Sequence, residues 1–317
     1  MSLSPFRGIA ALCLLAPAPV FACSSCGCSL TSDWLSQGLV SVPGTVLSLR
    51  YDDVPQTRLQ DGRAGVDRRA IALPADREIE RYTYNHYFTA TLDHQFAGAW
   101  GVNLQVPASY RPHVTVAPGD TDFSSSTTGG LGDVRVSARW QGIGGPGITG
   151  VQFGLKLPTG SFREHFLGGP QAGEEVDRGL QPGTGTTDAL VGAYHYGRIA
   201  PKVDVILQAL AQIPLNDRAG YKPAIATNLS AGFHYTGWAG ITPQLQVNFR
   251  IAGRDSGVNS DREHSGGELL YVAPGGIVRV SSRASAFAYV QVPVYQRVIG
   301  YQLVPTYTAS LGINYRL

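Results

Sequence analysis

Several long segments of this chain alternate between apolar and polar residues. The segment 134–140, VRVSARW, places Val, Val, Ala and Trp on one face of an extended strand and Arg, Ser and Arg on the other. The segments 151–157, VQFGLKL, and 241–251, ITPQLQVNFRI, follow the same rule. Successive side chains of a β-strand point to opposite sides, so a period of two predicts strands with one apolar face and one polar face.

Twelve such segments follow one another along the chain. Most reach about 10 residues or more, which exceeds the usual 5 or 6 residues of soluble strands and fits a tilted strand that crosses a bilayer. The segments are 44–53, 81–95, 100–111, 130–141, 147–158, 186–197, 202–214, 223–236, 239–252, 268–281, 285–297 and 304–317.

The connections between these segments alternate in length. Short connections, such as 142–147 and 237–238, take turns with long ones, at 54–80, 112–129, 159–185 and 253–267. Short turns on one side and long loops on the other are typical of outer-membrane barrels. The sequence therefore predicts an all-β fold, a transmembrane antiparallel up-and-down β-barrel of about 12 strands. Because the number of strands is even, we expect both termini on the periplasmic side of a Gram-negative outer membrane.

The last segment bears on assembly and on partners. Residues 307–317, YTASLGINYRL, alternate up to the carboxyl terminus and look like the signal read by the barrel-assembly machinery of the outer membrane. We expect as partners that machinery, outer-membrane lipid and lipopolysaccharide, and a small-molecule solute. The chain carries 25 basic and 23 acidic side chains, and this near-neutral balance argues against nucleic acid as a partner.

The beginning of the chain reads as an export signal. Arg7 precedes an apolar stretch, and Ala22 offers the small residue that a signal peptidase requires. We expect a signal peptide at 1–22, a cysteine-containing periplasmic segment at 23–43 that serves as a plug or a tether, and an outer-membrane β-barrel at 44–317.

Three cysteines, Cys23, Cys26 and Cys28, open the expected mature chain. Three readings stand side by side. Thiolates at this spacing suit Cu(I) or Zn, although three ligands leave tetrahedral zinc short by one. Cys23 is a candidate for lipidation. In an oxidising compartment, two of the three are expected to form a disulfide and leave one odd thiol. No other cofactor is expected.

Charged residues on the polar strand faces are the candidate pore lining. By alternation this set is Arg50, Asp93, Asp133, Arg135, Arg139, Lys156, Asp204, Arg250 and Arg316. Its mostly basic character leaves two interpretations: a ladder of paired charges that makes the barrel rigid, or a constriction that favours anions. No G-x-S-x-G motif occurs, and we expect no catalytic residues and no enzymatic activity.

Two segments resemble a known family. Residues 129–140, GGLGDVRVSARW, and 153–160, FGLKLPTG, are similar to the outer-membrane transporter family labelled after the meta-pathway of phenol degradation, which is distantly akin to fatty-acid and toluene channels. The resemblance implies a barrel that passes small, hydrophobic molecules. The leading expectation is an outer-membrane channel for small solutes, hydrophobic or metal-related. The alternative is a barrel that anchors a cysteine-rich, metal-binding or redox-linked tail.

Overall fold

The structure, a computed structural model, describes residues 43–144 and 147–317. Within these residues the chain forms strands and two short 3-10 helices, and no helix is long and apolar enough to cross a membrane. The 3-10 helices are η2 (Arg68–Ala70) and η3 (Arg178–Leu180). The strands are β1 (Gly44–Asp61), β2 (Ala64–Gly65), β3 (Ile79–Gln95), β4 (Trp100–Val116), β5 (Ser124–Leu131), β6 (Arg135–Ile143), β7 (Ile148–Lys156), β8 (Asp188–Ala200), β9 (Val203–Pro214), β10 (Ala226–Tyr235), β11 (Ile241–Ala252), β12 (Gly267–Arg279), β13 (Ala284–Val298), β14 (Tyr301–Pro305) and β15 (Thr308–Arg316).

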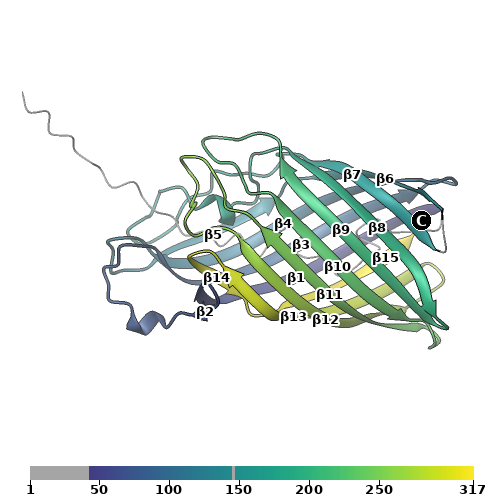
Figure 1. The fold of residues 1–317 in the computed structure, drawn as a ribbon. Coiled ribbons are helices and arrows are strands. Elements are labelled where there is room, and N and C mark those ends of the chain that lie inside the picture. The colour runs from purple at the N-terminus through teal and green to yellow at the C-terminus, as the bar shows by residue number, and fades with distance from the viewer. Residues whose placement is uncertain (1–42, 145–146) are drawn as a thin grey trace, which may run out of the picture.

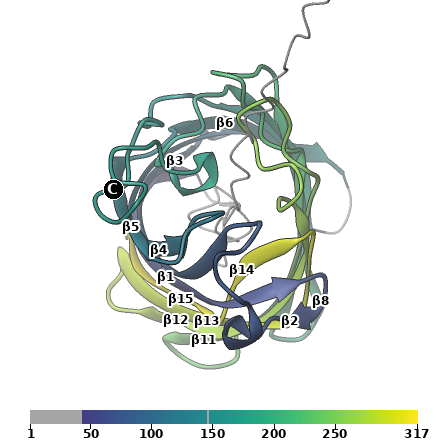
Figure 2. The same ribbon diagram turned by 90° about the vertical axis from the view of Figure 1, so that its left-hand side faces the viewer.

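The strands close into an antiparallel barrel (Figures 1 and 2). Closure occurs at β1, which pairs with β15 on one side and with β3 on the other. Two of the twelve positions around the barrel are each filled by two successive strands. β5 and β6 both pair with β4, and β14 and β15 both pair with β1. The expected antiparallel barrel of twelve strands is confirmed.

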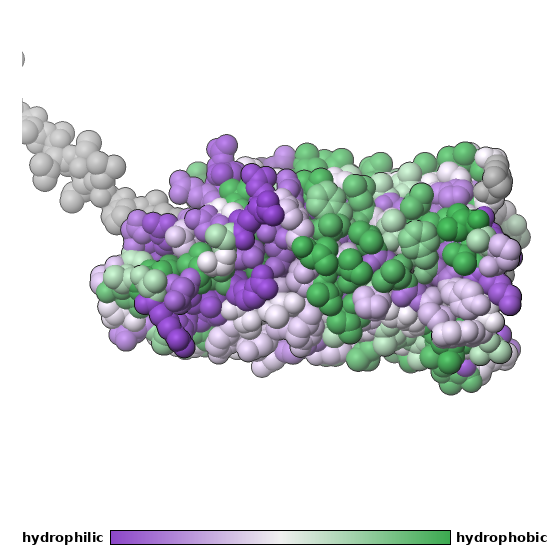
Figure 3. Space-filling model, turned by 60° about the horizontal axis from the view of Figure 1, so that its bottom comes forward, coloured by the Kyte–Doolittle hydropathy of each residue, from purple (hydrophilic) through white to green (hydrophobic). Residues whose placement is uncertain are grey.

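The outer wall is apolar over a band whose height matches a bilayer. Trp100 and Tyr110 stand at the two ends of this band on β4, and each is about half exposed. Ten residues at about 3.3 Å each, on a strand tilted by about 40°, rise about 25 Å, which is the height of the apolar band in outer-membrane barrels. Figure 3 shows the apolar band next to a more polar end of the molecule.

The two ends of the barrel differ in their connections. Short turns at 96–99, 201–202, 236–240 and 280–283 close one end, where the carboxyl terminus also lies (Figure 1). The other end, called the long-loop end below, carries residues 62–78, 117–123, 157–187, 215–225 and 253–266.

Two of the expected long loops are shorter than predicted. β1 runs on to Asp61, and most of 112–129 is strand, because β4 ends at Val116 and β5 begins at Ser124. Beyond the bilayer both faces of a strand meet water, so alternation no longer marks where the strand ends. The loop of residues 157–187 is the expected long one and contains η3.

Candidate functional site: a basic cavity in the barrel lumen

A cavity of about 200 Å³ lies inside the barrel toward the long-loop end. Strands from around the barrel and the 157–187 loop line it. Its basic lining residues are Arg50, Arg111, Arg135, Lys156, Arg178 and Arg250, and its acidic ones are Asp133 and Asp255. Arg50 pairs with Asp52, and Lys156 pairs with Asp133 and Asp188, and the lining still keeps an excess of positive charge. Apolar groups such as Pro107 and Leu210 take part as well.

Five of the nine predicted pore-lining residues lie at this cavity, namely Arg50, Asp133, Arg135, Lys156 and Arg250. They come from β1, the break between β5 and β6, β6 itself, β7 and β11. Alternation placed their side chains on the polar face of each strand, and the closed barrel turns that face inward. That a solute passes them stays a prediction.

Two other predicted residues, Asp93 and Arg139, pair with each other below the cavity. Arg139 donates to both carboxylate oxygens of Asp93, at 2.6 and 2.9 Å, and its Nε donates to Gln95. Both side chains are almost completely buried. A bidentate guanidinium–carboxylate pair fixes the spacing of β3 and β6, which are separated by β4. It fits the interpretation of a paired-charge ladder.

The remaining two predicted residues lie toward the short-turn end. Asp204 on β9 accepts hydrogen bonds from Arg198 and Tyr196, at 2.9 and 2.8 Å. Arg316 is exposed near the end of the chain and donates to the carbonyl of Pro43 at 2.9 Å. Neither lines the cavity.

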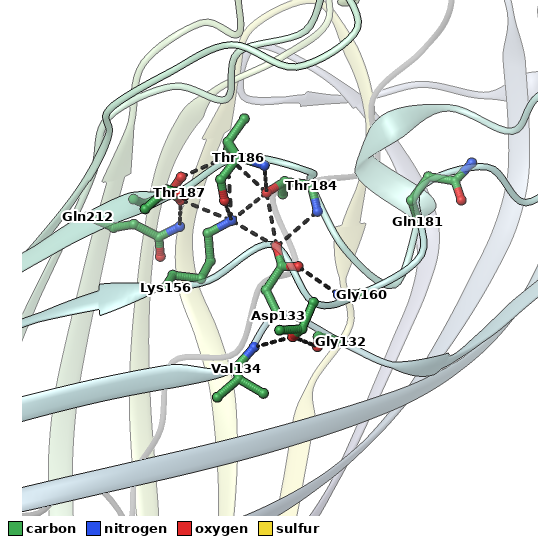
Figure 4. A network of polar contacts seen from close by, with 12 residues as sticks. Gly132, Asp133, Val134, Lys156, Gly160, Gln181, Thr184, Thr186, Thr187 and Gln212 are labelled. Atoms are coloured by element: carbon green, nitrogen blue, oxygen red, sulfur yellow. Dashed lines mark hydrogen bonds and ion pairs between the residues drawn. The ribbon is translucent and has the colours of Figure 1, made fainter.

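A buried network joins Lys156 to the barrel wall and to the 157–187 loop (Figure 4). The Lys156 ammonium lies 2.8 Å from Asp133 and 3.2 Å from Asp188. It also donates to the Thr184 hydroxyl and to the Thr186 carbonyl. The Lys156 ammonium thus forms ion pairs with two buried carboxylates.

The break between β5 and β6 explains how Asp133 reaches this network. Residues 132–134 leave the strand ladder, and the Asp133 carboxylate accepts backbone N–H bonds from Gly160 at 3.1 Å and from Thr184 at 2.9 Å. Gly160 packs so closely on Gly183 and Gly132 that an added Cβ would lie 2.8 Å from Gly183 Cα. The two ends of the 157–187 loop are therefore fixed to the barrel wall.

Two cavity arginines were not among the predicted residues. Arg111 on β4 donates to the Gly179 carbonyl at 2.9 Å and to the Tyr87 hydroxyl at 3.1 Å. Arg178 in η3 donates to the Arg218 carbonyl at 2.7 Å, and its guanidinium carbon lies 4.3 Å from the centre of the Phe162 ring. Arg111 has the inward parity of β4, which alternation could have shown. Arg178 lies in a loop and follows no such pattern.

Arg111, Arg178 and Arg250 have neutral hydrogen-bond partners. Arg250 donates to the side-chain oxygen of Asn228 at 3.1 Å. Among the described residues, no carboxylate lies within ion-pair distance of these three guanidinium groups. Burial lowers the pKa of Arg178, yet an arginine in a protein keeps its proton at neutral pH. Their charge therefore has no ion-pair partner among the described residues, although the charges of Glu175 and Asp177 raise the pKa of Arg178.

The cysteines of the predicted metal site, Cys23, Cys26 and Cys28, lie outside the described residues, as do the predicted signal peptide and almost all of the 23–43 segment. Within residues 43–144 and 147–317, no group of three or more His, Asp or Glu side chains is arranged to hold a metal ion. The copper or zinc prediction therefore rests on the sequence.

Comparisons with known proteins reveal the fold. No protein-family model matches the sequence, and no curated protein matches it. An outer membrane channel from Pseudomonas putida F1 is 11% identical with a TM-score of 0.64, over 88% of this chain and 97% of that one. The β domain of a Bordetella autotransporter is 12% identical with a TM-score of 0.52, over 87% and 100%. The translocator domain of the Neisseria meningitidis autotransporter NalP is 10% identical with a TM-score of 0.51, over 90% and 92%. The chain has the fold of outer-membrane barrels, and the phenol meta-pathway resemblance stays a prediction.

Proposed function

We propose that this protein is an outer-membrane channel that passes small organic anions through the barrel lumen. The observation that supports it is the excess of cationic side chains at the cavity, three of which have only neutral partners among the described residues. Fixed cations in a low-dielectric lumen attract anions and disfavour cations. The apolar groups in the same lining suit a solute with an organic body.

In this proposal the long-loop end faces the outside of the cell and the short-turn end faces the periplasm. The 157–187 loop narrows the lumen, since it is fixed at both ends by Asp133 and contributes Arg178 to the cavity. The carboxy-terminal strand, β15, closes the barrel against β1. We expect the barrel-assembly machinery to read this strand. The role needs no catalytic group, in line with the expectation of no enzymatic activity.

Liposome swelling tests the proposal directly. Erythritol and erythronate are four-carbon chains that differ in one carboxylate, and neither crosses lipid readily. Valinomycin lets K⁺ cross the lipid, so that entry of erythronate through the protein sets the swelling rate in potassium erythronate. After the swelling rate of protein-free liposomes is subtracted, proteoliposomes with the mature protein should swell faster in potassium erythronate than in erythritol. Equal rates for the two solutes would argue for a channel without charge preference. No swelling in either would contradict a channel.

A further inference from the structure

A second hollow lies on the outside of the barrel at the long-loop end, and the channel role does not use it. It has a volume of about 500 Å³ and lies between the η2 segment and the outer faces of β3 and β4. Its lining residues are Val66, Asp67, Arg68, Arg69, Arg81, Tyr82, Val114 and Phe123. We call it the arginine groove. In Figure 1 the η2 turn lies outside the wall at this end.

The apolar side of the arginine groove belongs to the outer wall. Tyr82 and Val114 are register partners on β3 and β4. Their side chains point away from the lumen, since the neighbouring Thr83 and His113 are buried inside. Phe123, in the loop after β4, is half exposed. The groove therefore offers an apolar floor that faces outward.

Three arginines stand together at this floor. Arg68 donates to the backbone carbonyls of Glu80 at 2.8 Å and Thr57 at 3.0 Å. The guanidinium carbon of Arg81 lies 5.0 Å from the centre of the Phe123 ring. Arg69 is exposed. Burial lowers the pKa of Arg68, and the nearby positive charge of Arg81 lowers it further.

None of these arginines forms an ion pair with an acidic side chain of the described residues, although the charge of Glu80 raises the pKa of Arg68. In the part of the chain that the structure describes, none of the three lies within 4.0 Å of an acidic oxygen. Asp67 lines the groove, but its side chain accepts the backbone N–H of Arg69 at 3.0 Å and caps η2. Like charges this close repel each other unless an anion lies among them. The arrangement is complementary to a ligand with more than one negative charge.

The height of the groove indicates what kind of anion it meets. Outward-facing aromatic rings form a girdle that begins at the groove floor with Tyr82 and continues toward the short-turn end. The ring centres of Tyr82 and Tyr84 lie 5.1 Å apart, and those of His86 and Tyr110 lie 6.0 Å apart. Aromatic girdles mark the boundary between the apolar band and the headgroup region. Arg81 lies one residue closer to the long-loop end than Tyr82 of this girdle. The groove is therefore at the height of the lipid headgroups.

We propose that the arginine groove binds the phosphorylated sugar headgroup of an outer-leaflet glycolipid of the lipid A type. The phosphates lie among Arg68, Arg69 and Arg81, and the first carbons of an acyl chain lie on Tyr82, Val114 and Phe123. Arginine pairs with phosphate through two parallel N–H bonds, and the higher negative charge of a phosphate matches a cluster of arginines better than a singly charged carboxylate does. The orientation with the long-loop end outward comes from the proposed function, but the groove does not depend on conduction.

Native mass spectrometry of the detergent-purified protein tests this, with bisphosphorylated lipid A as the probe. Wild type should bind one lipid A with an affinity that falls roughly tenfold or more in the double variant Arg69→Gln/Arg81→Gln. This variant keeps Arg68, which supports the loop. The matched control is Arg254→Gln/Arg262→Gln, two exposed arginines in another loop at the same end, and it should bind as wild type does. An equal loss of lipid A affinity in both double variants, or no loss in Arg69→Gln/Arg81→Gln, would overturn the proposal.

A second measurement does not depend on how the variants fold. Monophosphoryl lipid A and phosphatidylglycerol should each bind wild type more weakly than bisphosphorylated lipid A. Equal affinity for all three would show a non-specific lipid surface and would also overturn the proposal. Swelling rates from the preceding test report on the channel separately, so a failure of either proposal can be told from a failure of the other.

Discussion

Lys156 and Asp133 form an ion pair of 2.8 Å in which the side chains are only 4% and 6% exposed. The pair connects the end of β7 to the break between β5 and β6, and Asp188 lies 3.2 Å from the same ammonium. The Asp133 carboxylate in turn fixes both ends of the 157–187 loop. The shape of the cavity therefore depends on this one lysine.

Replacing Lys156 with methionine should destabilise the barrel. Lys156→Met leaves Asp133 and Asp188 buried without their cation, and such a loss costs about 3–5 kcal/mol in free energy of unfolding. Urea titration of the lipid-reconstituted protein measures it. Arg198→Gln is the control, because Arg198 pairs with Asp204 but is 66% exposed, and exposed pairs contribute about 0–1 kcal/mol. Similar losses in the two variants would refute the anchoring role.

Closure of the barrel depends on a glycine in its last strand. A Cβ at Gly312 would lie 2.4 Å from the Leu49 carbonyl oxygen on β1 and 2.5 Å from the Phe287 ring on β13. Gly312→Ala should therefore cost about 1–3 kcal/mol of stability, the usual cost of overpacking. Gly98→Ala is the control, because no atom lies within 4 Å of its Cβ position in a short turn. An unchanged urea midpoint for Gly312→Ala would contradict the packing described at this seam.

The stability of the 157–187 loop region should depend on pH through Asp177. Burial raises the pKa of its carboxyl well above the ordinary value, and the charges of Asp261, Glu78 and Glu80 raise it further. One of its oxygens is buried without a hydrogen bond. The folded protein thus holds this proton more tightly than the unfolded chain. The carboxyl favours folding fully below the ordinary aspartate pKa, and this contribution is lost as pH rises through the raised pKa.

Asp177→Asn should therefore raise the urea midpoint at pH 7 and leave it nearly unchanged at about pH 3.5, below the ordinary aspartate pKa. The asparagine side chain is nearly the same size, and the Asp177 side chain makes no capping hydrogen bond to η3 that would be lost. An equal shift at both pH values would show that charge is not the cause.

The metal prediction for Cys23, Cys26 and Cys28 can be checked by elemental analysis. The mature protein should carry stoichiometric copper or zinc, and the triple Cys→Ser variant should carry none. A disulfide or a lipid on Cys23, with no metal in wild type, would leave the cysteines a structural or anchoring role.

Much of the barrel could be predicted from the sequence because the bilayer imposes a simple rule. A strand that faces lipid on one side and a polar lumen on the other must alternate for about 10 residues. This is why alternation predicts Arg135, Lys156 and Arg250 on the face that the structure turns inward. The same reasoning fails above the bilayer, where β5 begins in a run of Ser and Thr that shows no apolar face.

The composition of the cavity was harder to foresee. Alternation shows which face of a strand a residue occupies, but it does not show the position of that residue along the barrel axis. Tilted strands shift their register around the barrel, so equal positions in two strands can lie at different levels. It could not show that Asp93 pairs with Arg139, or that Lys156 pairs with both Asp133 and Asp188. Arg178 reaches the lumen from a loop, so only the folded chain places it there.

The ion selectivity of the reconstituted channel tests the central claim most directly. In a planar bilayer with a KCl gradient, the wild-type reversal potential should have the sign of anion selectivity. Arg111→Gln/Arg250→Gln removes two cavity charges and should move it toward zero. Arg69→Gln/Arg81→Gln removes the same number of charges from the outer wall and should leave the reversal potential unchanged. A cation-selective wild type, or equal shifts in the two variants, would contradict the proposal that the cavity arginines select the solute.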